Sequence, residues 1–148
     1  MTRRFVSLGV LAVVFVPAAL LGAQPGKDDA KKIQGVWVLK AVEKDGTAVK
    51  LPKEMKWTFG LEAAGAGQVV PENERDAAKY KLGVDKKLGT FDLTPLAGGD
   101  KGKTYRGLYE LKGDTLTICL PEEAGAARPT AINSKGKHLV LTLKRDKP

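Results

Sequence analysis

The chain has 148 residues, a formal net charge of +8 and a single cysteine, Cys119. One cysteine excludes an intrachain disulfide framework, so the fold must be stabilised by a hydrophobic core. The excess of 25 basic over 17 acidic residues favours solubility and attraction to acidic surfaces, without defining a fold.

The first 23 residues have the features of a secretory signal peptide. Arg3 and Arg4 give a positive start, an apolar run follows over 5–16, and Ala23 is a small residue at an acceptable cleavage position. We therefore predict a signal peptide at 1–23, a polar linker at 24–29, one domain at 30–146, and a periplasmic or extracellular location. The alternative is an uncleaved anchor, since 5–23 is nearly long enough to span a bilayer. Contact with a membrane is expected only through such a retained leader.

Short elements follow in the rest of the chain. Acids followed by lysines predict a short helix at 28–33. Alternation of apolar and polar residues predicts strands at 36–43, 47–51, 55–61, 80–84, 89–93, 105–111, 115–120 and 138–145. Turns are predicted at Asp45-Gly46 and at 85–87. The segment 62–79 is ambiguous: it allows a short strand at 68–70, and a helical turn or a loop at 72–78.

The clearest β-hairpin spans 103–120, with Lys112 and Gly113 as its predicted turn. This turn places Leu111 opposite Asp114, and Arg106 opposite Cys119 on the outer face. The inner face of the hairpin is apolar, and its members are Tyr105, Gly107, Tyr109, Leu116, Ile118 and Leu120. The outer face carries Arg106, Leu108, Glu110, Thr115, Thr117 and Cys119.

Seven or eight short strands without intervening helices predict an all-β fold, either an antiparallel barrel or a sandwich. The apolar and polar faces separate cleanly along each strand. A sheet of this kind tends to curl around its apolar side, which favours the barrel.

Several motifs occur in a characteristic order: residues 33–37 (IQGVW), the Asp45-Gly46 turn, 107–111 with 113–116, Arg128-Pro129-Thr130, and the closing strand at 139–145. Together they resemble a family of small exported lipocalin-like domains that is abundant in planctomycete bacteria and has no assigned biochemical function. The resemblance covers most of 30–146. It implies an antiparallel lipocalin-like barrel of about eight strands with a short N-terminal helix, and it implies no known ligand.

Gly35 and Trp37 also resemble the opening of lipocalins in general. In that group the tryptophan plugs one barrel end and a late arginine packs on it, which implies a cation–π contact between Trp37 and Arg145. The alternative is that Trp37 is an ordinary core residue. The segment 62–79 departs from the family pattern, which has a clearer strand there.

Residues that carry chemistry are sparse. The stretch 97–104 fits a relaxed phosphate-loop pattern, but a strand follows it instead of the required helix, so no nucleotide site is predicted. Cys119 is either a thiol activated by Arg106 or a small covered residue. His138 is the only histidine and has no partner at metal-ligand spacing. We predict no catalytic residue, no metal and no cofactor, and hence no enzyme.

The lysines are dispersed over many strands and the aromatic residues face the other way, which argues against a nucleic-acid partner. The candidate ligand-binding residues are the inward aromatics Trp57, Phe59, Tyr80, Phe91, Tyr105 and Tyr109. They either line a cavity for a small apolar or amphipathic ligand or fill a core. The sequence therefore predicts a monomeric, exported binding domain. The alternative is an envelope interaction or structural module that uses its outer face or the loops at 95–102 and 121–129.

Overall fold

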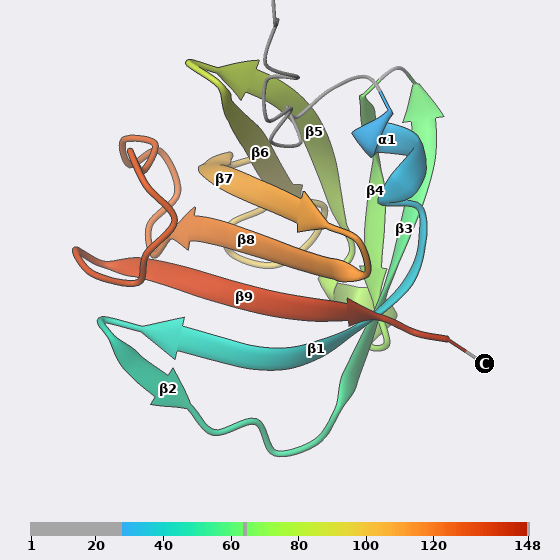
Figure 1. Cartoon of the computed structure of the whole chain (residues 1–148), viewed down its shortest axis with the longest axis horizontal. Coiled ribbons are helices and arrows are strands. Elements are labelled where there is room, and N and C mark those ends of the chain that lie inside the picture. Colours follow the sequence, from blue (N-terminus) through green and yellow to red (C-terminus); the bar gives the residue numbers. More distant parts are fainter. Residues whose placement is uncertain (1–27, 64, 148) are drawn as a thin grey trace, which may run out of the picture.

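The computed structural model describes residues 28–63 and 65–147 (Figure 1). The predicted signal peptide at 1–23 and most of the predicted linker lie outside the described residues. The elements are α1 (Asp29–Lys32), β1 (Gly35–Lys44), β2 (Thr47–Val49), β3 (Met55–Ala63), β4 (Ala66–Pro71), the 3₁₀ helix η1 (Glu74–Asp76), β5 (Ala78–Asp85), β6 (Leu88–Pro95), β7 (Tyr105–Lys112), β8 (Thr115–Pro121) and β9 (His138–Arg145).

The strands form one antiparallel sheet that closes on itself. Each strand from β3 to β9 pairs with the next one, β1 pairs with β3, and β9 returns to β1. This closes a barrel of eight strands. The ninth strand, β2, pairs only with the end of β1, where Val42 lies opposite Val49. The all-β antiparallel barrel with a short N-terminal helix, which the sequence predicts, is confirmed.

The ambiguous segment supplies a complete strand and a helical turn. β4 is composed mainly of glycine, alanine and valine, and two neighbours fix its place: Gly60 lies opposite Gln68, and Gly67 lies opposite Tyr80. In η1 the Asn73 side chain accepts a hydrogen bond from the Arg75 backbone N–H. Pairing with β3 and β5 therefore overrides the weak strand propensity of glycine and alanine.

The central hairpin has a register that differs from the predicted one by two residues. Lys112 lies opposite Thr115, so the turn residues are Gly113 and Asp114. Gly113 has φ of +56°, as expected at the first central position of a type II′ turn. The predicted pairing of Leu111 with Asp114 is wrong, because Leu111 lies opposite Leu116. A shift of two residues preserves the face of every side chain, so the inward set is unchanged.

The same shift corrects the surroundings of Cys119, which lies opposite Leu108 and not opposite Arg106. Leu108 and Cys119 are on the outer face of the sheet but are buried. The segment after β8 returns over them: Arg128 Nη1 donates to the Gly107 carbonyl at 2.7 Å, and the Cys119 thiol donates to the Asn133 carbonyl at 3.5 Å. This segment covers part of the outer face of β7 and β8.

Candidate functional site

The six predicted ligand-binding aromatics divide into two groups. Phe59, Tyr80, Phe91 and Tyr109 are buried members of the core cluster. Trp57 and Tyr105 pack against that cluster but remain partly exposed. The structure therefore brings four of the predicted residues into the barrel interior and leaves two near the solvent.

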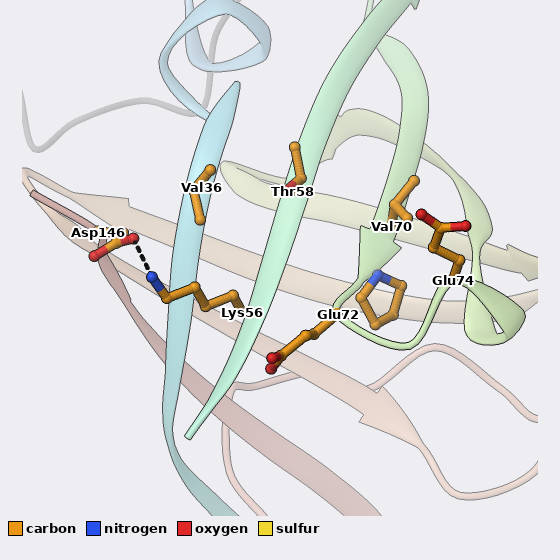
Figure 2. A pocket seen from close by; sticks show the side chains of 8 residues that line it. Val36, Lys56, Thr58, Val70, Glu72, Glu74 and Asp146 are labelled. Atoms are coloured by element: carbon orange, nitrogen blue, oxygen red, sulfur yellow. Dashed lines mark hydrogen bonds and ion pairs between the residues drawn. The ribbon is translucent and has the colours of Figure 1, made fainter. Parts of the chain in front are cut away.

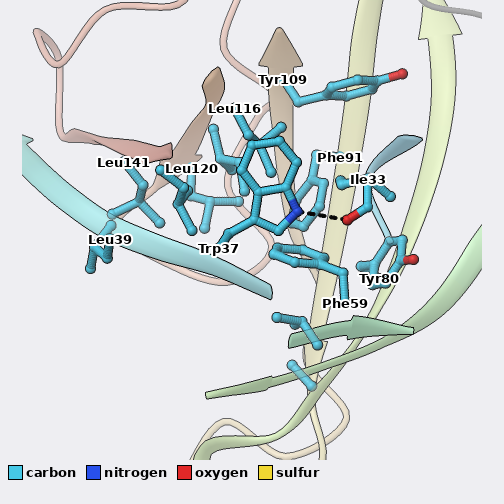
Figure 3. Packing of buried hydrophobic residues seen from close by; sticks show 14 residues of the cluster. Ile33, Trp37, Leu39, Phe59, Tyr80, Phe91, Tyr109, Leu116, Leu120 and Leu141 are labelled. Carbon is cyan, nitrogen blue, oxygen red and sulfur yellow. Dashed lines mark hydrogen bonds between the residues drawn. The ribbon is translucent and has the colours of Figure 1, made fainter. Parts of the chain in front are cut away.

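The buried rings pack on one another instead of lining a space. The rings of Tyr80 and Phe91 are stacked with their centroids 5.8 Å apart, and Phe59 meets Tyr80 edge-on at 5.5 Å (Figure 3). Phe59 also lies 6.4 Å from Phe91 and 6.5 Å from Trp57. These separations are typical of aromatic pairs in direct contact. The interior of the barrel is filled where these rings meet.

Glycines make room for the buried rings. Tyr80 lies opposite Gly67, Phe91 opposite Gly107, and Tyr109 opposite Gly89. A Cβ atom on Gly67 would lie 1.8 Å from the Gly60 carbonyl oxygen, and one on Gly89 would lie 2.6 Å from the Tyr109 ring. At Gly67 and Gly89 the tyrosine on the neighbouring strand therefore occupies the space beside the glycine, an arrangement that stabilises glycine within a sheet, whereas at Gly107 that space is taken by the Cys119 carbonyl and the Leu120 side chain.

The hydroxyl groups of the buried tyrosines have partners in the protein. Tyr80 Oη donates to the Gly60 carbonyl at 3.0 Å, and Tyr109 Oη donates to Asp29 Oδ2 at 2.8 Å. Burial raises the pKa of both phenols, and the neighbouring charge of Asp29 raises the pKa of Tyr109 further. These hydroxyl groups hold the rings and α1 in place and are not free to bind a ligand.

The end of the barrel next to α1 is closed by Trp37 and Arg145. Trp37 is fully buried and its Nε1–H donates to the Ile33 carbonyl at 2.8 Å. The Arg145 guanidinium lies 4.3 Å from the centre of the indole ring and donates to the carbonyls of Gln34 and Lys32. This contact is the one that the lipocalin resemblance implies, and its role is structural.

Arg145 also joins this end to the turn between β7 and β8. Its Nε lies 3.3 Å from Asp114 Oδ1, and Lys147 Nζ lies 2.5 Å from Asp114 Oδ2. The hydrogen bond from Lys147, together with both positive charges, holds the pKa of the Asp114 carboxyl below its usual value.

The opposite end of the barrel is less well covered. Partly buried apolar side chains occupy strand positions farther from α1; they include Val42, Met55, Leu93 and Tyr105. Tyr105 Oη donates to Asp100 Oδ2 at 2.6 Å, in the loop before β7. This hydrogen bond raises the pKa of Tyr105 and lowers the pKa of Asp100.

The structure gives no support for a reactive thiol. Burial raises the pKa of Cys119, which disfavours the nucleophilic thiolate. The hydrogen bonds of its sulfur go to the carbonyls of Ala131 and Asn133, and within the described residues none joins it to His138. In the part of the chain that the structure describes, no three histidine, cysteine or acidic side chains gather at a spacing that would hold a metal ion.

An open groove of about 520 Å³ lies on the outer face of β1, β3 and β4 (Figure 2). It is lined by Val36, Lys56, Thr58, Val70, Pro71, Glu72, Glu74 and Asp146. Val36, Thr58 and Val70 project from the adjacent strands β1, β3 and β4. Val36 lies opposite Thr58, and Thr58 lies opposite Val70. Register alone therefore brings Val36, Thr58 and Val70 into one row across the sheet.

The charges around the groove are mainly negative. Lys56 Nζ pairs with Asp146 Oδ2 at 3.0 Å, and this hydrogen bond, with the nearby charges of Asp146, Glu72 and Glu54, raises the pKa of Lys56. Glu72 and Glu74 are exposed and form no ion pair with any residue that the structure describes. The groove therefore offers two unpaired carboxylates beside an apolar row, on a chain whose net charge is strongly positive.

None of the groove residues is among the binding residues predicted from the sequence. They come from β1, β3 and β4, from the segment that follows β4 and from the chain's C-terminal segment, and Val36, Thr58 and Val70 occupy outward positions that a pattern analysis assigns to solvent. The only local signal is Pro71, which ends β4, followed by the acids Glu72 and Glu74.

Comparisons with protein-family models, with curated proteins and with solved structures find no match for this chain. Within the described residues, no helix has the length and apolar character needed to cross a membrane.

Proposed function

We propose that this chain is an exported, non-enzymatic lipocalin-like domain that binds a peptide segment of a partner protein in the groove over β1, β3 and β4. One observation carries the proposal: the buried aromatics occupy the barrel interior, whereas the groove on the outer face is open. The proposal thus develops the alternative predicted from the sequence, an interaction module that uses its outer face.

A ligand inside the barrel would have to displace side chains that are already well packed. Rotating Phe59, Tyr80 or Phe91 out of contact would break ring contacts at 5.5–6.4 Å, and moving Tyr80 would also uncover Gly67. Opening space in a close-packed core costs several kcal/mol, roughly the cost of deleting a large core side chain. A small apolar ligand would have to repay this free energy before it gained any affinity.

The groove fits an extended segment that combines an apolar side chain with lysine or arginine. The apolar row of Val36 and Val70 would contact the apolar side chain, and the unpaired carboxylates of Glu72 and Glu74 would attract the cation. Charge complementarity of this kind contributes mostly to specificity and association rate, so we expect modest affinity.

Chemical-shift titration of the isotopically labelled chain tests the proposal. The probes are a short synthetic peptide of alternating lysine and valine and its glutamate–valine counterpart. We expect the lysine peptide alone to shift the amides of Val36, Thr58 and Val70. Replacing both rim acids (Glu72→Gln, Glu74→Gln) should weaken binding about fivefold, because exposed ion pairs contribute up to about 1 kcal/mol each.

Glu123→Gln is the matched control, because this exposed acid lies in the segment between β8 and β9, away from the groove. It should leave the affinity unchanged. Equal binding of both peptides, or shifts centred on Trp57 and Tyr105, would contradict the proposal.

A small apolar ligand held beside the partly exposed Trp57 is the second candidate function. The partly buried apolar side chains packed around the core favour it. Native mass spectrometry of the exported protein separates the two: the groove proposal expects the mass of the chain alone. A reproducible extra mass, lost on gentle activation together with a change in Trp57 fluorescence, would favour the ligand.

A further inference from the structure

We propose that the tip of the β5–β6 hairpin docks this domain on an anionic membrane surface. The inference goes beyond the peptide-binding groove and does not depend on it. It rests on three features of the same hairpin: exposed apolar side chains, unpaired lysines, and an unfavourable backbone conformation at those lysines.

The apolar feature is a concentration of exposed hydrophobic side chains. Among the described residues only Val49, Leu61, Val84 and Leu88 are large hydrophobic residues with high exposure. Val84 has the largest exposed fraction, 58%, and Leu88 is on the other strand of the same hairpin, one position from the turn. Val84 and Leu88 thus flank a single turn, the one between β5 and β6, which projects from one end of the barrel (Figure 1).

The turn itself consists of Lys86 and Lys87, because Asp85 lies opposite Leu88. Both lysines are exposed, and neither forms an ion pair with another residue in the described ranges. Lys79 and Lys81, exposed on the outward positions of β5, extend the positive charge along the hairpin. Asp85 is the only acid between Lys81 and Asp92, and Asp92 is paired with Arg128 at 2.8 Å.

The backbone of the turn is unfavourable for lysine. Lys86 and Lys87 have φ of +48° and +71°, and two positive values in succession are typical of a type I′ turn, where asparagine and glycine are preferred. The β1–β2 turn of this chain has the same form with Asp45 and Gly46. Two lysines at such positions reduce stability, and residues that break a local rule in this way concentrate at functional sites.

A lipid surface is the partner that this chemistry fits. Exposed valine and leucine can enter the boundary between headgroups and acyl chains, while lysines reach anionic phosphates and keep their ammonium groups in water. Each lysine near an anionic surface contributes about a fivefold gain in binding. Nucleic acid fits less well, because single-strand binding uses aromatic stacking and residues 84–88 contain no aromatic side chain.

Vesicle co-sedimentation of the full chain tests the inference, with vesicles of phosphatidylcholine alone or mixed with phosphatidylglycerol. We expect tighter binding to the anionic vesicles, reduced by salt. The variant carrying Lys86→Asn and Lys87→Gly installs the favoured turn residues. It should raise the melting temperature while weakening binding to anionic vesicles about tenfold to thirtyfold.

Matched controls separate the hairpin from the overall charge and from the predicted leader, which is common to all variants. Val84→Asn should weaken binding severalfold, whereas Val49→Asn, at the exposed valine of β2, should leave it unchanged. Lys50→Ala with Lys53→Ala should likewise have little effect. The inference is overturned if the Asn-Gly variant binds as tightly as the original chain, or if both lysine pairs weaken binding equally.

Discussion

Two tryptophans on the inward face of the sheet, Trp37 on β1 and Trp57 on β3, lie opposite each other at the same level of the barrel. Trp37, next to α1, is fully buried, donates a hydrogen bond to the Ile33 carbonyl and is covered by the Arg145 guanidinium. Trp57 lies directly opposite it on β3, yet it stays partly exposed and contacts Phe59 at a tilted angle. The two indoles are paired in the sheet and differ in how completely the protein surrounds them.

This difference shows how a small barrel divides its aromatic residues between stability and recognition. A tryptophan with its N–H satisfied and both faces covered contributes its whole apolar surface to folding. A partly exposed tryptophan contributes less and leaves some of that surface for a ligand or partner. Trp37 therefore contributes chiefly to the fold, and Trp57 leaves part of its ring exposed.

The largest predicted effect comes from truncating the two tryptophans. Trp37→Ala should lower the free energy of unfolding by about 3–5 kcal/mol, because it removes a fully buried ring together with its hydrogen bond and cation–π contact. Trp57→Ala should cost about 1–2 kcal/mol, since part of that ring already faces water. Urea unfolding followed by circular dichroism measures both values.

Trp37→Phe and Trp57→Phe are the matched conservative variants. The phenylalanine at 37 still loses the hydrogen bond to Ile33, so it should remain clearly destabilised, whereas Trp57→Phe should be close to neutral. Equal losses at the two positions would remove the distinction between the two tryptophans.

Much of this architecture could be predicted from alternation alone. The inward positions of β3, of β5–β9 and of the first half of β1 follow from a period of two, and an error of two residues in the central hairpin left the inward set intact. In β1 the alternation wrongly placed Ala41 on the inner face, because the register shifts after Leu39 and Val42 packs on the core instead. The contact between Trp37 and Arg145 was implied by a resemblance and not by the spacing of the two residues. The strand β4 was ambiguous because its glycine, Gly67, is accommodated by the Gly60 backbone and the Tyr80 side chain, which belong to the neighbouring strands β3 and β5.

The groove and the covered outer face could not be predicted, for a related reason. Both depend on which outward side chains meet across strands, and on where a loop returns. Alternation places Leu108 and Cys119 on the outer face, where exposure is expected. In the structure both are buried, because the segment from 122 to 137 covers them. Whether the predicted aromatics line a cavity or fill a core likewise depends on which glycine faces which ring.

Replacing Arg145 with lysine tests how the covered end is held, with a smaller expected effect. Arg145→Lys keeps the positive charge near Asp114 but loses the planar group that spans Trp37 and donates to the Gln34 and Lys32 carbonyls. We expect a loss of about 1–2 kcal/mol in the free energy of unfolding. Thermal unfolding monitored by tryptophan fluorescence measures it.

Lys144→Arg on the same strand is the control, because Lys144 is exposed and faces away from Trp37. It should leave the stability unchanged. A loss as small for Arg145→Lys as for this control would mean that charge alone, without the planar geometry, closes the barrel end.

The smallest effect appears only at high pH and compares two tyrosines, Tyr109 next to α1 and Tyr105 at the other end of β7. Burial and the Asp29 carboxylate raise the pKa of Tyr109 near α1, whereas the partly exposed Tyr105 is raised chiefly by its hydrogen bond to Asp100. A phenol whose pKa is higher in the folded than in the unfolded chain stabilises the fold fully below the unfolded value of about 10. That stabilisation is lost as the pH rises through the folded value. The contribution of these tyrosines to the free energy of unfolding should therefore be flat up to about pH 10 and fall above it.

Absorbance of the phenolate during an alkaline titration resolves the order in which the tyrosines ionise. Tyr105→Phe should remove the earliest change, because the ring of Tyr105 is the least buried of the three. Tyr109→Phe should remove a later change that coincides with unfolding. Loss of the earliest change in Tyr109→Phe would contradict this order. It would show that water reaches Tyr109, beneath α1, more readily than it reaches Tyr105, beside the loop before β7.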